Sequence, residues 1–183
     1  MAASSVPALT AAYAAGKKGE AKRQIGIATR FIMVIAFPCA VGMGILASPI
    51  LQLLFRDSSE TAAHMLQVGA VTILFFSLST LSNGLLQGIG RMKEPIKNAI
   101  IALVLHLGLL AALMFLFDLN IFAVVIANAA FGLIMCILNA GSIRRYSGYH
   151  QEIRKTFFVP AIAAAGMGVV VSVSYTHLTL PTK

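Results

Sequence analysis

The sequence predicts an all-α protein, a polytopic bundle of about five transmembrane helices. Hydrophobic residues make up 58% of the 183-residue chain and charged residues 11%, against roughly 45–50% and 25% in soluble domains. The apolar residues fall in long runs, and the few charges lie between them. Because backbone groups in lipid must bond within their own segment, such runs predict helices, and no alternating strand pattern is present.

The first 24 residues precede the apolar runs. They lack the charged stretch followed by an apolar core that marks a signal peptide. We expect residues 1–24 to form an amphipathic segment on the cytoplasmic side of the membrane.

Four runs are long enough to cross a bilayer, which takes about 20 predominantly apolar residues. No charged or histidine residue lies in the runs Phe31–Phe55 and Leu119–Ile143, whereas Thr61–Gly90 contains only His64 and Asn98–Phe117 only His106. A fifth run begins at Thr156 and is shorter. The expected transmembrane helices cover approximately 25–55, 63–90, 95–117, 119–143 and 157–172. Pro38 and Pro49 should kink or interrupt the first of them.

The basic residues predict the orientation. Leaving aside Lys183 in the tail, twelve of the 14 Lys and Arg residues lie on one side of the expected spans, and Arg56 alone lies in the opposite loops. Since cytoplasmic loops carry the Lys/Arg excess, we expect a multi-pass protein of the cell (cytoplasmic) membrane with its N-terminal segment in the cytoplasm. No nucleic-acid partner is expected, because the cations fall in short bursts between apolar runs. The twelve are Lys17, Lys18, Lys22, Arg23, Arg30, Arg91, Lys93, Lys97, Arg144, Arg145, Arg154 and Lys155.

The chain offers little for catalysis. Each of its six carboxylates lies in a loop or at the end of a span, whereas glycosyl or acyl transfer needs an acid or base at the reacting group. Cys39 and Cys136 lie within different spans and are interpreted as small apolar packing residues. We therefore expect no enzyme activity, no metal site and no cofactor.

Three stretches carry a family resemblance: "VPALTAAYA" near the start, "FPCAVGMGILASPILQLLF" in the first span and "LLQGIGRMKEPIKN" between the second and third spans. Over about Ser4–Val170 the chain resembles polysaccharide-export flippases of the multidrug/oligosaccharidyl-lipid/polysaccharide superfamily. The branch it resembles most is the stage V sporulation protein B group, related to the lipid II flippase. The resemblance implies two six-helix lobes around a central cavity, of which this chain would supply part of the second, so the missing N-terminal lobe becomes an expected partner.

The end of the chain has a different character. The stretch "VSYTHLTLPT" is the translation, in one frame, of a transposase adaptor used in sequencing libraries. We therefore predict that residues 173–183 are an adaptor artefact rather than a native polar tail, and that the fifth span is incomplete.

Four polar residues in or near the spans are candidates to line a substrate cavity. His106 is the one ionisable group near the centre of a span, where such groups are often functional; a neutral imidazole bonded to a neighbouring helix is the equal alternative. Asn83 and Gln87 lie four residues apart on one helical face, and could contact sugar hydroxyls or join helices. Asn98, at the start of the third run, completes the set.

Arg91, Lys93 and Lys97 are candidates for a cytoplasmic mouth that captures an anionic lipid headgroup. The positive-inside rule alone explains these cations as well. Gly84 and Gly88 form a GxxxG pattern, which predicts a close helix-packing surface.

These observations together predict a fragment of a flippase or exporter that moves lipid-linked oligosaccharide or polysaccharide precursors across the membrane by alternating access. Its expected partners are membrane lipids and the lipid-linked saccharide substrate. A multidrug or cation antiporter of the same superfamily is the first alternative, and a structural membrane subunit without a transport function is the second.

Overall fold

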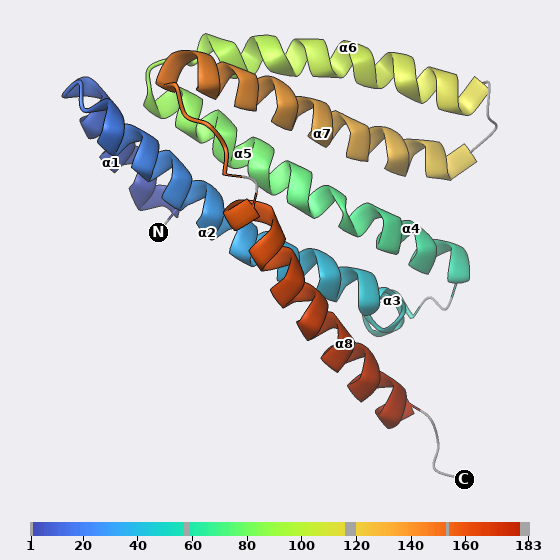
Figure 1. Ribbon diagram of the computed structural model, residues 1–183. Helices are drawn as coiled ribbons and strands as arrows, with labels where there is room; N and C mark the ends of the chain where they lie inside the picture. Colours follow the sequence, from blue (N-terminus) through green and yellow to red (C-terminus); the bar gives the residue numbers. More distant parts are fainter. Residues whose placement is uncertain (1, 57–58, 116–119, 153, 180–183) are drawn as a thin grey trace.

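The computed structural model describes residues 2–56, 59–115, 120–152 and 154–179, and within these ranges the chain is helical and contains no strand. Asp57 and Asp118, which the sequence places in loops, lie outside the described residues. The helices pack side by side in a bundle (Figure 1). Their bounds are α1 (Ala2–Ala14), α2 (Lys18–Ile45), α3 (Ala47–Phe55), α4 (Glu60–Ala70), α5 (Thr72–Gly88), α6 (Lys93–Phe115), α7 (Asn120–Ser147), a π-helical turn η1 (Arg154–Phe158) and α8 (Val159–Thr179).

Five helical segments are long and apolar enough to cross a membrane, which confirms the predicted all-α membrane bundle. The five segments are Lys18–Ile45, Glu60–Gly88, Lys93–Phe115, Ile121–Ser147 and Arg154–Ser174. Helix α1 has 13 residues and is about 20 Å long, too short to cross a hydrocarbon core of about 30 Å.

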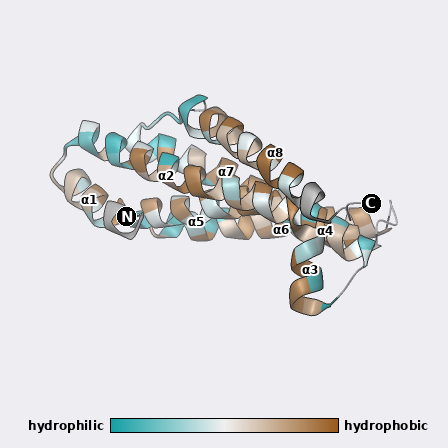
Figure 2. Ribbon diagram, turned by 90° about the horizontal axis from the view of Figure 1, so that it is seen from below, coloured by the Kyte–Doolittle hydropathy of each residue, from teal (hydrophilic) through white to brown (hydrophobic). Residues whose placement is uncertain are grey.

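The expected first span is divided into α2 and α3, which meet at Leu46. Pro38 lies within α2 without ending it. Pro49 is the third residue of α3, a first-turn position where its missing N–H costs no intrahelical bond. The interruption predicted from the prolines is therefore confirmed near Pro49, and Figure 2 shows α3 turning away from the axis of α2.

Helix α2 lies at the centre of the arrangement and packs against α1, α5, α8 and α4. On the other side α7 packs against both α5 and α6, so α6 and α8 form opposite edges of the bundle (Figure 1). Both edge helices expose large apolar side chains, among them Val104 and Ile162. Such surfaces suit contact with lipid or with further apolar helices.

One end of the bundle, which we call the basic end, contains the start of α2, the α5–α6 connection and the end of α7. The helix ends and connections here carry Lys17, Lys18, Arg91, Lys93, Arg144 and Arg145. A buried cluster near this end joins α1, α2, α5 and α7, with Leu9, Ile25 and Leu85 each at most 1% exposed.

The predicted close-packing surface on α5 is confirmed, and the helix that packs there is α1. A Cβ atom added at Gly88 would lie 3.0 Å from Val6 Cγ1, and one added at Gly84 would lie 3.9 Å from Val6 Cγ2. The contact at Gly84 would be an ordinary van der Waals distance, so it is the absence of a side chain at Gly88 that lets α1 approach α5 closely.

Helix α8 continues to Thr179, into the segment 173–183; residues 180–183 lie outside the described part. A helical backbone does not report the origin of the codons, so the adaptor interpretation stays a prediction.

Candidate functional site

An asparagine network joins three helices in the interior. Asn139 on α7 is completely buried and donates from Nδ2 to Asn83 Oδ1 on α5 at 2.8 Å. Asn98 on α6, 7% exposed, donates from Nδ2 to Asn139 Oδ1 at 2.9 Å and to Ser142 Oγ at 3.1 Å. Buried amides of this kind hold membrane helices together by satisfying one another. The geometry of Asn83 and Asn98 favours the helix-joining interpretation over a cavity lining.

Gln87 and His106 do not belong to this network. Gln87 is exposed on α5. His106 on α6 is partly buried, with Nδ1 3.0 Å from the carbonyl oxygen of Ala127 on α7, and its ring meets Phe131 edge-on at 5.6 Å between centroids. Because a carbonyl oxygen can only accept, Nδ1 is the donor in this hydrogen bond, which is the arrangement expected of a histidine bonded to a neighbouring helix.

Two of the three cations predicted to form a mouth contact Tyr146 or its hydrogen-bond partner Glu94 at the basic end. The guanidinium carbon of Arg91 lies 4.5 Å from the centroid of Tyr146, a cation–π distance. Tyr146 donates its hydroxyl to Glu94 Oε1 at 3.1 Å, and Lys97 Nζ lies 3.7 Å from the same oxygen. Lys93 is exposed. Of the three predicted cations, Arg91 and Lys97 therefore already have partners on this surface.

A short segment after α7, residues 148–152, lies against α2. Gly148 has a φ of 65°, which glycine adopts without steric cost, and the turn lets the chain leave α7 towards α2. The Tyr149 hydroxyl lies 3.4 Å from the position of a Cβ at Gly26. Farther along, Arg30 forms an ion pair with Glu152. Since α2 rises about 1.5 Å per residue, these contacts lie about 12 and 18 Å from its first residue.

Tyr149 is held in an unusual environment. Burial raises the pKa of its phenol above the ordinary value of 10.0, and the nearby Glu152 carboxylate raises it further. Within the described part of the chain, neither the buried Tyr149 hydroxyl nor the buried Nε of Arg30 has a hydrogen-bond partner. Both groups are therefore donors available to water or to a ligand.

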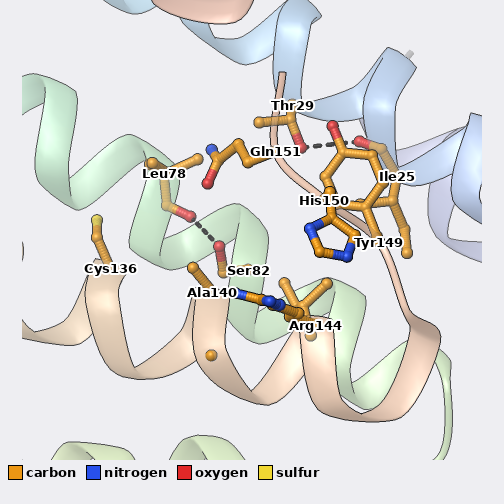
Figure 3. A pocket seen from close by; sticks show the side chains of 12 residues that line it. Ile25, Thr29, Leu78, Ser82, Cys136, Ala140, Arg144, Tyr149, His150 and Gln151 are labelled. Carbon is orange, nitrogen blue, oxygen red and sulfur yellow. Dashed lines mark hydrogen bonds between the residues drawn. The ribbon is translucent and has the colours of Figure 1, made fainter. Parts of the chain in front are cut away.

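Residues 148–152 close one side of a cavity of about 320 Å³ among α2, α5 and α7, which we call the basic-end cavity. Figure 3 shows Thr29, Ser82, Arg144, Tyr149, His150 and Gln151 around it. Ile25, Leu78, Cys136, Ala140 and Ile143 add apolar walls. The cavity thus combines an apolar interior with a polar, cationic rim.

The two aliphatic hydroxyl groups in this cavity, those of Thr29 and Ser82, use their protons within their own helices. Thr29 Oγ1 donates to the Ile25 carbonyl at 2.8 Å, and Ser82 Oγ donates to the Leu78 carbonyl at 2.7 Å. Each oxygen keeps lone pairs that accept hydrogen bonds. The hydroxyls are thus acceptors, whereas Arg144 supplies only donors.

A second hollow of about 460 Å³ lies on the other side of Tyr149 and His150, which line both spaces. Its lining includes Lys22, Arg23 and the Arg30–Glu152 pair. Around the two spaces, four Lys or Arg residues meet one carboxylate. This end of the bundle therefore favours an anion.

Sequence reasoning did not identify Asn139, Ser142 or the cavity residues of the 148–152 segment. Asn139 is a polar residue inside an apolar run, and that signal was available. The described residues contain no group of three or more His, Cys, Asp or Glu side chains arranged to hold a metal ion.

Comparison with known proteins gives one family and two curated relatives. The family model described as "Lipid II flippase MurJ" matches residues 2–181. A "Probable lipid II flippase MurJ" of Bdellovibrio bacteriovorus is 30% identical over 158 residues, which cover 81% of this chain and 29% of that protein. The "Lipid II flippase MurJ" of Bacillus subtilis is 27% identical over 177 residues, covering 92% of this chain and 31% of that protein. No solved structure matches the chain. The chain therefore spans about 30% of the length of these relatives.

Proposed function

We infer the function from one premise: this chain belongs to the lipid II flippase MurJ family. It is a multi-pass protein of the cell membrane with five apolar helices that could cross it. We propose that these helices form part of a flippase that moves a lipid-linked cell-envelope precursor from the cytoplasmic to the outer leaflet. The match over residues 2–181 carries this proposal.

The precursor we propose is lipid II itself or a related lipid-linked saccharide. The resemblance to the stage V sporulation protein B group is finer than the matched family, and that branch remains a proposal. The protein would act as a transporter rather than an enzyme, since no carboxylate interrupts the apolar runs and acid–base chemistry at a substrate needs such a group.

We propose that the basic end faces the cytoplasm. The helix ends and connections at this end carry Lys and Arg residues, and such an excess is found on the cytoplasmic side of membrane proteins. With this orientation Arg91, Lys93 and Lys97 would face the compartment from which the phosphate-bearing precursor is taken.

Transport should require helices from outside this chain. The two relatives are about three times as long as the segment that matches this chain. Alternating access needs two bodies that move around one site. The five spans form a layered bundle with exposed apolar edges, so further helices of the same protein are the proposed partner.

A complementation experiment tests this function. Cells depleted of their own lipid II flippase would express either this chain alone or a chimera in which it replaces residues of the Bacillus subtilis relative that it matches. We expect the chimera to restore lipid-linked precursor on the outer face, and the lone chain not to. A chimera that is inserted at normal levels yet leaves the precursor inside would contradict the proposal, as would full activity of the lone chain.

A further inference from the structure

The basic-end cavity is not explained by the asparagine network or by the cations around Tyr146. It lies on a different face, between α2, α5 and α7, and its rim comes largely from residues after α7. Irregular backbone beside membrane helices occurs where it is buried in protein or lines a polar cavity. The position of residues 148–152 against α2 therefore marks this space as a candidate binding site.

We propose that the basic-end cavity binds the phosphate-bearing, hydroxylated headgroup of a membrane amphiphile in the leaflet next to the basic end. Binding at this site needs only residues of these helices and of the segment after α7, so it can be measured without transport; only the precursor as ligand rests on the proposed function. Two kinds of molecule carry such a headgroup: an anionic glycerophospholipid of that leaflet and a lipid-linked saccharide precursor.

The charge at the rim selects for a phosphate. Arg144 is exposed at the end of α7 and forms no ion pair with any carboxylate in the described ranges. A guanidinium can bind a phosphate through two parallel hydrogen bonds. Lys22 and Arg23 line the adjoining hollow and add positive potential. Basic pockets between membrane helices are established binding places for phospholipid headgroups.

The hydroxyl groups on the wall select for a ligand with donors. Thr29 and Ser82 have committed their protons to carbonyls of their own helices, so each can offer only acceptor lone pairs to the cavity. Both residues are at most 5% exposed. A glycerol or sugar hydroxyl supplies the donor that these buried oxygens lack, whereas a bare phosphate oxygen does not.

The lining and volume of the basic-end cavity suit an amphiphilic ligand. Ile25, Leu78 and Ile143 supply apolar walls to the same cavity that has the polar rim, and a volume of about 320 Å³ is in the range of small-ligand pockets. The unpartnered Tyr149 hydroxyl adds one more donor beside the rim. A headgroup would therefore be held in the cavity, with its hydrocarbon outside the polar part.

The test measures lipid binding to the purified chain in detergent micelles by native mass spectrometry, with three lipids as probes. Phosphatidylglycerol is anionic and hydroxylated, phosphatidylmethanol is anionic without headgroup hydroxyls, and phosphatidylcholine has no net charge. We expect phosphatidylglycerol to bind most tightly, phosphatidylmethanol less tightly, and phosphatidylcholine least.

Two neighbouring arginines give a matched pair of variants. Arg144→Gln should weaken binding of both anionic lipids about fivefold, the effect of one cation near the headgroup. Arg145→Gln removes the same charge from the next residue, which lies 5.8 Å from the Tyr146 ring and does not line the cavity, and should change binding less than about twofold. Equal losses in the two variants would mean only diffuse attraction by the basic end, and would overturn the proposal.

A second variant tests the hydroxyl contact. Ser82→Ala should weaken phosphatidylglycerol and leave phosphatidylmethanol unchanged, since only the former carries a headgroup hydroxyl. An equal effect on both lipids, or on neither, would refute the headgroup assignment. Competition between a lipid-linked disaccharide and bound phosphatidylglycerol identifies the natural ligand. If the disaccharide displaces phosphatidylglycerol when present at a lower concentration than it, the site is assigned to the precursor. If displacement needs a higher concentration of the disaccharide, the site is assigned to bulk phospholipid. The result is independent of the complementation experiment, because binding can hold where transport fails.

Discussion

Replacing Asn139 tests whether the buried amide network stabilises the bundle. Asn139→Ala removes the acceptor of Asn98 Nδ2 and the donor to Asn83 Oδ1, bonds of 2.9 and 2.8 Å. Hydrogen bonds between membrane helices are worth about 0.6 kcal/mol on average and at most about 1.7 kcal/mol. The two bonds together give a loss of about 1–3 kcal/mol in the free energy of unfolding.

The two native cysteines make it possible to follow unfolding by thiol labelling. Cys136 is buried and free, whereas Cys39 is exposed. In a Cys39→Ala background, a thiol-reactive fluorophore reports unfolding when Cys136 becomes accessible. At about 2–4 °C per kcal/mol for a chain of this size, we expect Asn139→Ala to lower Tm by roughly 2–12 °C.

The control is Asn128→Ala, which changes an exposed asparagine on the same helix. It should change Tm by less than about 2 °C, because surface substitutions usually change stability by at most about 0.5 kcal/mol. A double-mutant cycle of Asn98→Ala with Asn139→Ala should then return a coupling of about 0.6–1.7 kcal/mol. The reasoning fails if the two single asparagine variants of α7 behave alike, or if the coupling is near zero.

Three further results are expected. A Cβ at Gly168 would lie 2.7 Å from Val41 Cγ1, whereas one at Gly166 meets nothing within 4 Å; Gly168→Ala should therefore lower stability by about 1–3 kcal/mol in the same thermal assay, and a Gly166→Ala effect as large would contradict this packing. His106→Leu removes one bond to a carbonyl and should cost about 1 kcal/mol without changing transport in the chimera; lost transport at unchanged Tm would instead show a functional histidine. The pKa of Tyr149 is raised in the folded state, so its contribution to stability should be complete below the unfolded pKa of about 10 and be lost as pH rises through the folded value. Comparing the alkaline unfolding of the wild type with that of Tyr149→Phe checks the sign. An identical pH dependence of the two would refute it.

The all-α fold was predictable because it depends on local chemistry. An apolar run long enough to cross the bilayer must form a helix wherever it packs, so the spans were predictable without knowledge of their neighbours. Gly84 and Gly88 predicted a packing surface for the same local reason. The pattern could not predict that Val6 packs there, because a missing side chain does not specify its partner.

The candidate site was less predictable because it depends on contacts between distant parts of the chain. Asn83 and Asn98 were recognised as polar residues in apolar surroundings, but their shared partner Asn139 lies 41 residues beyond Asn98. The Arg30–Glu152 pair spans 122 residues. The basic-end cavity exists because residues 148–152 lie against α2, and no residue spacing predicts that path.

Cysteine labelling of intact cells tests most directly the claim that the chain crosses the membrane with its basic end inside. In a Cys39→Ala, Cys136→Ala background, single cysteines would replace Lys18 and Lys93 at the basic end and Glu60 at the opposite end. The account predicts that a membrane-impermeant thiol reagent labels the Glu60→Cys variant in intact cells and the other two only after permeabilisation. Labelling of Lys18→Cys or Lys93→Cys from outside, with Glu60→Cys protected, would contradict it.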